Sequence, residues 1–271
     1  MTRPPREAAP AADPRPGPGP DRRPARLLAA LAVVVALGLA VGLAGVVSAT
    51  VTGRGAAAPV SPADLCPGAR DDPAAVTACL VVDLERTWST RTGRAIGLRV
   101  EVDPAPARVH RSCRAFLALG TAFYCPSDAR AYVTGESVAG LRREFGERLP
   151  YALATVVAHE AAHRVQYAVR EPGLDDEGDP ASRRVEQQAD CLAGVWAADA
   201  ARRGLLEPAA FRAVYAREMA LVSAVRPPPG SGLEGYDEIA THGTPAQRVA
   251  AFERGAAPGA RPATACSLRR G

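Results

Sequence analysis

The sequence predicts an α+β fold, mostly helical with a small sheet, that follows a single N-terminal transmembrane helix. An uncharged apolar run over residues 27–51 is long enough to be that helix. Alternating residues over 96–102, and short apolar runs at 122–125 and 129–133, favour three strands. Apolar residues spaced three and four apart dominate the later part of the chain and predict helices there.

The N-terminal segment predicts the membrane topology. Residues 1–26 contain eight Pro and carry a net charge of +3, so we expect a disordered cytoplasmic tail. A helix over 27–51 would be roughly 37 Å long, which exceeds the ~30 Å hydrocarbon core of a bilayer. Because positive charge is greater on the N-terminal side, the remainder should lie outside the cytoplasmic membrane. The alternative is a signal peptide cleaved near Val47-Ser48-Ala49, but such apolar regions are usually only ~7–15 residues long.

We therefore expect a single-pass protein of the cell membrane, anchored in the lipid bilayer, with a linker at 52–65 and an extracytoplasmic domain at 66–271. The net charge of the whole chain is +4, so the exported part is near +1, which argues against a nucleic-acid partner. All six Cys follow the apolar run, and an even number in an exported domain indicates disulfides. Cys113 and Cys125 suit a staple across a hairpin, whereas Cys191 has the alternative of a buried free thiol.

The spacing of apolar residues, and residues that commonly begin or end helices, predict six helices in the domain. Pro73 suits a first helical turn, Asp179-Pro180 can cap and start another helix, and Thr244 opens a capping box. The acidic residues 175–179 predict a solvated turn, because their spacing is not that of a calcium loop. Residues 256–264 are expected to be irregular. The predicted helices cover 73–90, 137–145, 151–170, 179–203, 208–224 and 244–254, the last ended by Gly255.

The most informative motif is His159-Glu160-Ala161-Ala162-His163, an H-E-x-x-H pattern in an apolar, helix-prone run. Residues four apart share one face of a helix, so His159 and His163 can direct two imidazoles at one point. This is the arrangement of zinc hydrolases, in which the two His bind Zn²⁺ and the Glu acts as general base. The structural alternative is a pair of core histidines.

A catalytic zinc site needs a third protein ligand and one open position. Glu186 follows His163 by 23 residues, enough for one helix to end and another to return. Asp190, one helical turn further on, is placed to accept the second ring N–H of a ligand His. The alternative exchanges the two roles, with Asp190 as ligand and Glu186 as its support.

A hydrolase of this kind also needs a donor for the oxyanion that forms when water attacks a carbonyl. His242, between Thr241 and Gly243, is a candidate, and a structural role for it is equally open. Tyr132, Tyr151 and Tyr236 are further candidates.

Four segments resemble one bacterial family, the putative neutral zinc metallopeptidases, whose members usually carry an N-terminal hydrophobic anchor. The resemblance covers about residues 76–255, and the segments occur in the family's order. They are Val156–Gln166, Phe123–Asp128, Glu186–Ala197 and His242–Val249.

The resemblance implies a zincin-like fold, Glu186 as third ligand, and hydrolysis of a peptide or protein substrate. Two residues depart from the family pattern: Ala162 stands where a Gly is expected, and Arg164 where a His is expected. Neither change removes a ligand or the base. Two other functions stay open, namely a non-catalytic envelope protein with a structural metal site and a zinc amidase acting on cell-wall material.

Overall fold

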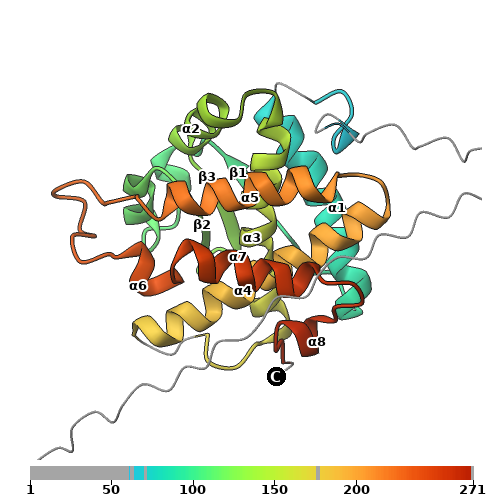
Figure 1. The fold of residues 1–271 in the computed structure, drawn as a ribbon. Coiled ribbons are helices and arrows are strands. Elements are labelled where there is room, and N and C mark those ends of the chain that lie inside the picture. The colour runs from blue at the N-terminus through green and yellow to red at the C-terminus, as the bar shows by residue number, and fades with distance from the viewer. Residues whose placement is uncertain (1–60, 62–63, 70–71, 175–177, 270–271) are drawn as a thin grey trace, which may run out of the picture. The chain divides into compact units, whose positions relative to one another are not determined.

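The computed structural model describes residues 61, 64–69, 72–174 and 178–269, all within the compact unit Gly55–Gly271. These residues form a mostly helical domain with one three-stranded sheet, so the α+β prediction is confirmed (Figure 1). The predicted tail, the anchor at 27–51 and most of the linker lie outside the described residues. Within the described part of the chain, no helix is both long enough and apolar enough to span a membrane.

The predicted helices are present, with ends that differ by a few residues. Asp72 caps the first of them and Gly93 ends it in a left-handed conformation, as a C-terminal glycine commonly does. Two short helices were not predicted: α6, which contains His242, and α8, which lies partly in the stretch expected to be irregular. The helices are α1 (Pro73–Thr92), α2 (Gly135–Phe145), α3 (Leu149–Val169), α4 (Asp179–Arg202), α5 (Pro208–Val222), α6 (Glu238–His242), α7 (Pro245–Ala256) and α8 (Pro262–Ala265).

The sheet has the strand order β1-β3-β2, with β1 (Val100–Val102) parallel and β2 (Ala122–Cys125) antiparallel to β3 (Arg130–Val133). The predicted hairpin of β2 and β3 is confirmed. The strand predicted over 96–102 is too long, because only its last three residues pair with β3. The backbone N–H groups just before them donate to the Glu85 carboxylate on α1 instead.

Helix α3 is the centre of the domain and lies behind α5 and α7 in Figure 1. It packs against α1, α2, α4, α5 and both strands of the hairpin. Val157, Ala161 and Val165 are fully buried in the main core. Because α3 is covered on several sides, it is apolar around most of its circumference and not only along one stripe.

Two glycines allow α4 and α7 to pack closely. A Cβ atom at Gly255 would lie 1.8 Å from the Cys191 carbonyl oxygen, and one at Gly194 would lie 2.0 Å from the Phe252 carbonyl oxygen. The prediction that Gly255 ends the last long helix is therefore wrong. Helix α7 continues through Gly255 to Ala256, and the glycine serves the helix contact.

All six Cys form disulfides, which join Cys66 to Cys79, Cys113 to Cys125, and Cys191 to Cys266. The pairing of Cys113 with Cys125 is confirmed, but the bond does not cross a hairpin, because Cys113 precedes a 3₁₀ helix (Arg114–Leu119) and Cys125 ends β2. The free-thiol alternative for Cys191 is wrong. The Cys191–Cys266 bond has a sequence separation of 75 residues and attaches the C-terminal segment to α4.

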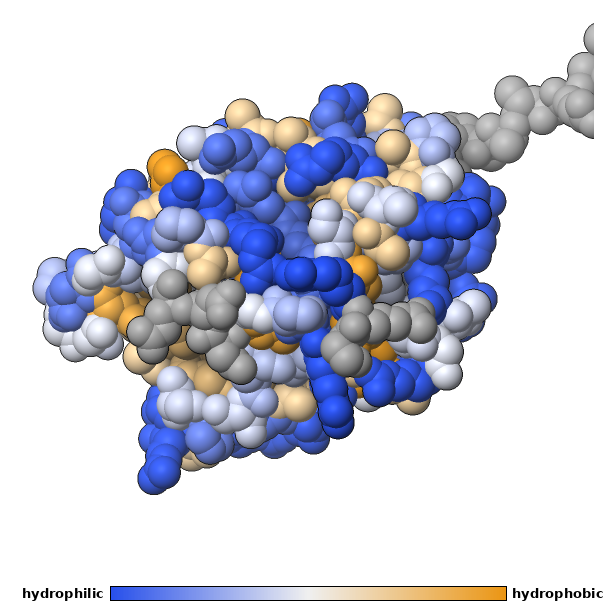
Figure 2. Space-filling view, turned by 90° about the horizontal axis from the view of Figure 1, so that it is seen from below, coloured by the Kyte–Doolittle hydropathy of each residue, from blue (hydrophilic) through white to orange (hydrophobic). Residues whose placement is uncertain are grey.

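The exterior is largely hydrophilic. Figure 2 shows one face on which hydrophilic residues predominate and apolar residues occur in small groups. Among the described residues, the large exposed hydrophobic side chains are Val82 and Ile239. The apolar side chains of the described domain are thus mainly used in its core.

Candidate metal centre

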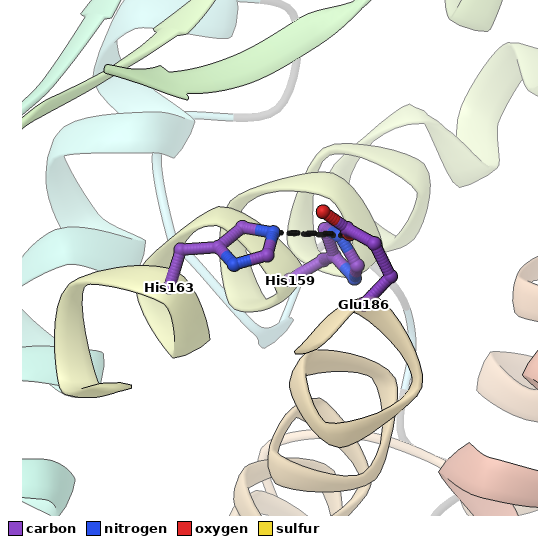
Figure 3. Close-up of side chains that lie close together, drawn as sticks. All are labelled: His159, His163 and Glu186. Atoms are coloured by element: carbon purple, nitrogen blue, oxygen red, sulfur yellow. Dashed lines mark hydrogen bonds and ion pairs between the residues drawn. The ribbon is translucent and has the colours of Figure 1, made fainter. Parts of the chain in front are cut away.

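Helices α3 and α4 bring His159, His163 and Glu186 together. Figure 3 shows both imidazole rings, carried on α3, directed toward the Glu186 carboxylate on α4. Glu186 Oε2 lies 3.0 Å from His159 Nε2 and 3.1 Å from His163 Nε2. The two Nε2 atoms are 3.2 Å apart. Three potential ligand atoms therefore converge on one point.

The chemistry and spacing of this group fit a catalytic zinc ion. Two imidazole nitrogens and one carboxylate oxygen are a known catalytic donor set, and tetrahedral bonds of ~2.1 Å would place ligands roughly 3.4 Å apart. Within the described residues, the group that could hold a metal consists of these three side chains. Because every Cys is in a disulfide, no thiolate can complete a closed structural site. The donor set leaves a coordination position for water.

The charges around the histidines favour a cation between them. Burial lowers the pKa of His159, but the carboxylates of Asp190 and Glu186 outweigh it and raise the value to about 10. Burial also opposes protonation of His163, and Glu186 raises the pKa of that ring above its ordinary value. Conversely, burial raises the pKa of Glu186, but the neighbouring His163 and His242 hold it well below its usual range. A divalent ion would satisfy the same negative potential.

An ionic cluster orients His159. Asp190 is fully buried, and its Oδ1 lies 2.9 Å from His159 Nδ1. The same carboxylate accepts a hydrogen bond of 2.7 Å from the Tyr215 hydroxyl and bonds of 3.0 Å from Arg248 Nε and Nη2. Burial raises the pKa of Asp190, yet Arg248 and His159 bring it below its ordinary value. An ionised Asp190 fixes the proton on His159 Nδ1 and leaves Nε2 free to bind a metal.

A chain of neutral amides orients His163. Its Nδ1 lies 2.9 Å from Gln166 Oε1, an atom that can only accept, so Nδ1 carries the proton. The Gln166 amide nitrogen donates to the Val185 carbonyl at 2.9 Å and to Gln188 Oε1 at 2.8 Å, which fixes the amide orientation. Gln188 in turn donates to the Cys266 carbonyl and to Oε1 of the buried Glu171, both at 3.2 Å. His163, like His159, is left with Nε2 directed at the centre.

Glu160 is buried and lines a cavity of about 520 Å³ beside the metal-binding group. No described residue forms a hydrogen bond with its carboxyl group. Burial raises the pKa of Glu160, although His159 and His163 act in the opposite direction. A carboxylate that is uncommitted, shielded from bulk water and close to the centre suits a general base.

His242 lies at the edge of the same group, as the last residue of α6 and not in a loop. Its Nε2 is 3.3 Å from Glu186 Oε2, and its Nδ1 is 2.8 Å from the Thr241 hydroxyl. Burial lowers its pKa, which favours a neutral ring. Tyr236 also lines the cavity and donates to Glu238.

The other two candidate donors lie elsewhere. The Tyr132 hydroxyl donates to Asp128 Oδ2 at 2.6 Å, and the Tyr151 hydroxyl accepts from the Glu207 backbone N–H at 2.8 Å. Neither tyrosine lines the cavity. Ala162, one of the two departures from the family pattern, is fully buried in the core and does not line the cavity either.

Several polar residues of the site were not identified from the sequence. Gln166 follows His163 by three residues, a spacing that places side chains side by side on a helix, and so could have been found. Arg248 gave no comparable signal, because a single sequence does not show that its guanidinium is buried between Asp190 and Glu238. The residues missed are Gln166, Gln188, Tyr215, Glu238 and Arg248.

Residues 13–267 match the family described as putative neutral zinc metallopeptidase. The uncharacterised Escherichia coli K12 protein YpfJ is 30% identical over 142 residues, which are 49% of this chain and 49% of that protein. The uncharacterised Mycobacterium tuberculosis H37Rv protein Rv2575 is 41% identical over 80 residues, or 28% of this chain and 27% of that protein. The matches thus span about half and about a quarter of these relatives. No solved structure matches the chain, so the zincin-like fold stays a prediction.

Proposed function

This chain belongs to the putative neutral zinc metallopeptidase family, and on that premise we propose that it is a zinc-dependent peptidase. The proposed metal ligands are His159, His163 and Glu186. One observation carries the proposal: three convergent donors, with an open coordination position, lie in a cavity beside the uncommitted carboxyl group of Glu160. A purely structural metal site would need a fourth protein ligand.

Zinc, when bound, supplies a Lewis acid that polarises a substrate carbonyl and makes water more acidic. Glu160 is the proposed base, which takes a proton from the attacking water and later transfers it to the leaving amine. Asp190 and Gln166 hold the two imidazoles so that Nε2 of each faces the centre. These contacts limit the reorganisation needed during the reaction.

His242 is the proposed hydrogen-bond donor to the developing oxyanion, with Tyr236 as the second candidate. Both side chains line the cavity, and a neutral His242 can donate through one ring nitrogen. His242 Nε2 carries the proton in this role, and the Thr241 hydroxyl then donates to Nδ1 in place of the Asp237 carbonyl, which lies 2.9 Å from the same hydroxyl.

Strand β2 supports a peptide as the substrate. It is an edge strand of the sheet, and Ala122, Phe123 and Tyr124 all line the cavity. An edge strand offers backbone N–H and C=O groups to an extended chain, which binds as an added strand. We therefore place the peptide backbone along β2, across the cavity from Glu186.

The proposed location is outside the cytoplasmic membrane, with the segment 27–51 as a lipid anchor and residues 66–271 as the catalytic domain. Three disulfides support an oxidising compartment, because such bonds are rare in the cytosol. Cysteine labelling from either side of intact cells, with single Cys residues placed in the tail and the domain, tests this topology.

Metal analysis tests the ligand set before any substrate is known. The purified wild-type chain should contain about one zinc per molecule, because the three proposed ligands form a single site. Glu186→Ala should contain much less, whereas Glu160→Gln should keep the metal and lose peptide hydrolysis. A folded wild-type protein without zinc, or hydrolysis that survives in Glu160→Gln, would refute the proposal.

A further inference from the structure

The cavity extends along α3 beyond the metal-binding group. Thr155, His159, His163 and Tyr167 are spaced four residues apart on one face of the helix, and all four line it. One end of the cavity lies around Thr155, which is about 6 Å along the helix axis from His159. Side chains of α2, α3 and α5 surround this end: Ser137, Leu141, Val156, Glu218, Met219 and Val222.

Glu218 is the acidic side chain that α5 contributes to the cavity. It is only 3% exposed, and its carboxyl group contacts the Thr155 hydroxyl. That hydroxyl also lies 2.8 Å from the Ala152 carbonyl oxygen and has a single proton to donate. Both contacts are hydrogen bonds only if Glu218 itself carries a proton, in agreement with burial raising its pKa to about 8.

The other acidic groups that line the cavity already have roles. Glu186 faces both imidazoles, Glu238 accepts from Arg248 at 3.0 Å, and Glu160 lies beside the proposed zinc position. No Arg or His of the described residues forms an ion pair with Glu218. An ionised Glu218 would have only the Thr155 contact and the more distant charges of Arg248 and His159 to offset its burial, which leaves a place for a cationic ligand group.

We propose that this end of the cavity is a subsite for a basic side chain of the substrate, Lys or Arg. The aliphatic stem would pack on the apolar side chains of α2 and α5, and the cationic end would bind the Glu218 carboxylate. Binding releases the carboxyl proton to solvent, so charge is balanced. The inference rests on the proposed peptidase function and assigns a specificity to the same site.

Matched peptides test the subsite by binding. We would use hexapeptides with an acetylated N-terminus and an amidated C-terminus, in which each position in turn is Lys or norleucine. The two residues differ by the terminal ammonium group. The binding protein is zinc-loaded Glu160→Gln full-length chain, alone or with Glu218→Gln. Glu144→Gln is the control, because Glu144 lies on α2 outside the cavity and pairs with Arg217.

At one position, the Lys peptide should bind at least about tenfold more tightly than the norleucine peptide, since hydrogen bonds to charged groups contribute at that level. Glu218→Gln should remove this preference, and Glu144→Gln should retain it. Equal binding of the two peptides, or a preference that survives Glu218→Gln, overturns the inference.

Two further arms separate the possible failures. A norleucine peptide with a free N-terminus that binds as tightly as the Lys peptide would assign the cation to the α-amino group and overturn the side-chain subsite. Cleavage of peptides by the wild type, without preference for Lys or Arg, would overturn the subsite and leave the peptidase function intact. Failure of every peptide to be cleaved or bound would overturn both.

Discussion

The two histidines of the candidate metal centre are one helical turn apart, yet their surroundings differ in kind. His159 is held by the charged groups Asp190 and Arg248, whereas His163 is held by the neutral amides of Gln166 and Gln188. Both arrangements place the imidazole proton on Nδ1 and direct Nε2 at the same point. A proposed metal ligand can therefore be oriented by direct contact with a neutral amide as well as with a carboxylate.

Charge has a second effect that the amides lack. Asp190 raises the negative potential at the centre, and its partner Arg248 also binds Glu238 at the end of the cavity near His242. The ionic cluster of His159, Asp190, Arg248 and Glu238 thus links α3, α4, α6 and α7. The amide chain of Gln166 and Gln188 instead ends in a hydrogen bond to the carbonyl of Cys266. The disulfide of Cys266 to Cys191 fixes the C-terminal segment on α4.

Of the substitutions considered, Asp190→Asn, which breaks the ionic cluster, is expected to have the largest effect on stability and zinc affinity. The change retains the shape of the side chain but removes one of the two carboxylates that pair with the buried Arg248 among the described residues, leaving Glu238. Loss of one partner from such a pair should lower the free energy of unfolding by about 3–5 kcal/mol. Zinc affinity should fall roughly 10–100-fold, because His159 loses the group that fixes its ring.

Denaturant unfolding and zinc titration measure these two quantities. Asp199→Asn is a matched control, since Asp199 is on the same helix and forms partly exposed ion pairs with Arg91, Arg202 and Arg203. It should lower stability by less than Asp190→Asn does and leave zinc affinity unaltered. A variant Asp190→Asn with wild-type zinc affinity would show that the ionic cluster does not position His159.

Gln166→Met, which removes the amide that orients His163, should have a smaller effect on stability and zinc affinity than Asp190→Asn. The substitution removes the acceptor at His163 Nδ1 and the side-chain donor to the Val185 carbonyl and to Gln188 Oε1. We expect a loss of about 1–3 kcal/mol in stability and roughly tenfold in zinc affinity.

Gln187→Met provides the control for this variant, because Gln187 donates to the His242 carbonyl and does not contact either imidazole. Its zinc affinity should match the wild type. If Gln166→Met weakens zinc binding as much as Asp190→Asn does, the distinction between the charged and neutral supports is incorrect.

The sequence predicted the parts of the site that depend on local periodicity. Residues His159 and His163 follow from helical spacing, and Glu186 from the need for a third ligand on a returning helix. It did not predict features that depend on contacts between distant helices. The burial of Arg248, the role of Gly255 at the α4–α7 contact and the position of Glu218 on α5 all arise from packing.

Strand β1, which begins at Val100 and not at residue 96 as predicted, illustrates the same limit. Residues 96–98 have the alternation of a strand, and Ile96 and Leu98 are indeed buried. Their backbone N–H groups, however, bind the Glu85 carboxylate, a partner that lies on a different element. Alternation indicates which side chains are buried, but it does not determine which group satisfies the backbone.

Two buried carboxyl groups beside α3, Asp190 and Glu218, extend the comparison to the pH dependence of stability. Asp190 has cationic partners and a lowered pKa, so its contribution to stability is lost as the pH falls below its ordinary value of 3.8. Glu218 contacts a hydroxyl, and burial raises its pKa from 4.5 to about 8 despite the opposing influence of Arg248 and His159.

The folded protein therefore holds the Glu218 proton over a range in which the unfolded chain has released it. Its contribution to stability is present below pH 4.5 and is lost as the pH rises toward about 8. Glu218→Gln removes that contribution, so the melting temperature of the wild type minus that of the variant should decrease steadily across this range. The difference is the quantity to measure, because the histidines titrate in the same range in both proteins. A difference that is constant or increases with pH would mean that Glu218 is ionised in the folded protein, held by a cationic partner as Asp190 is.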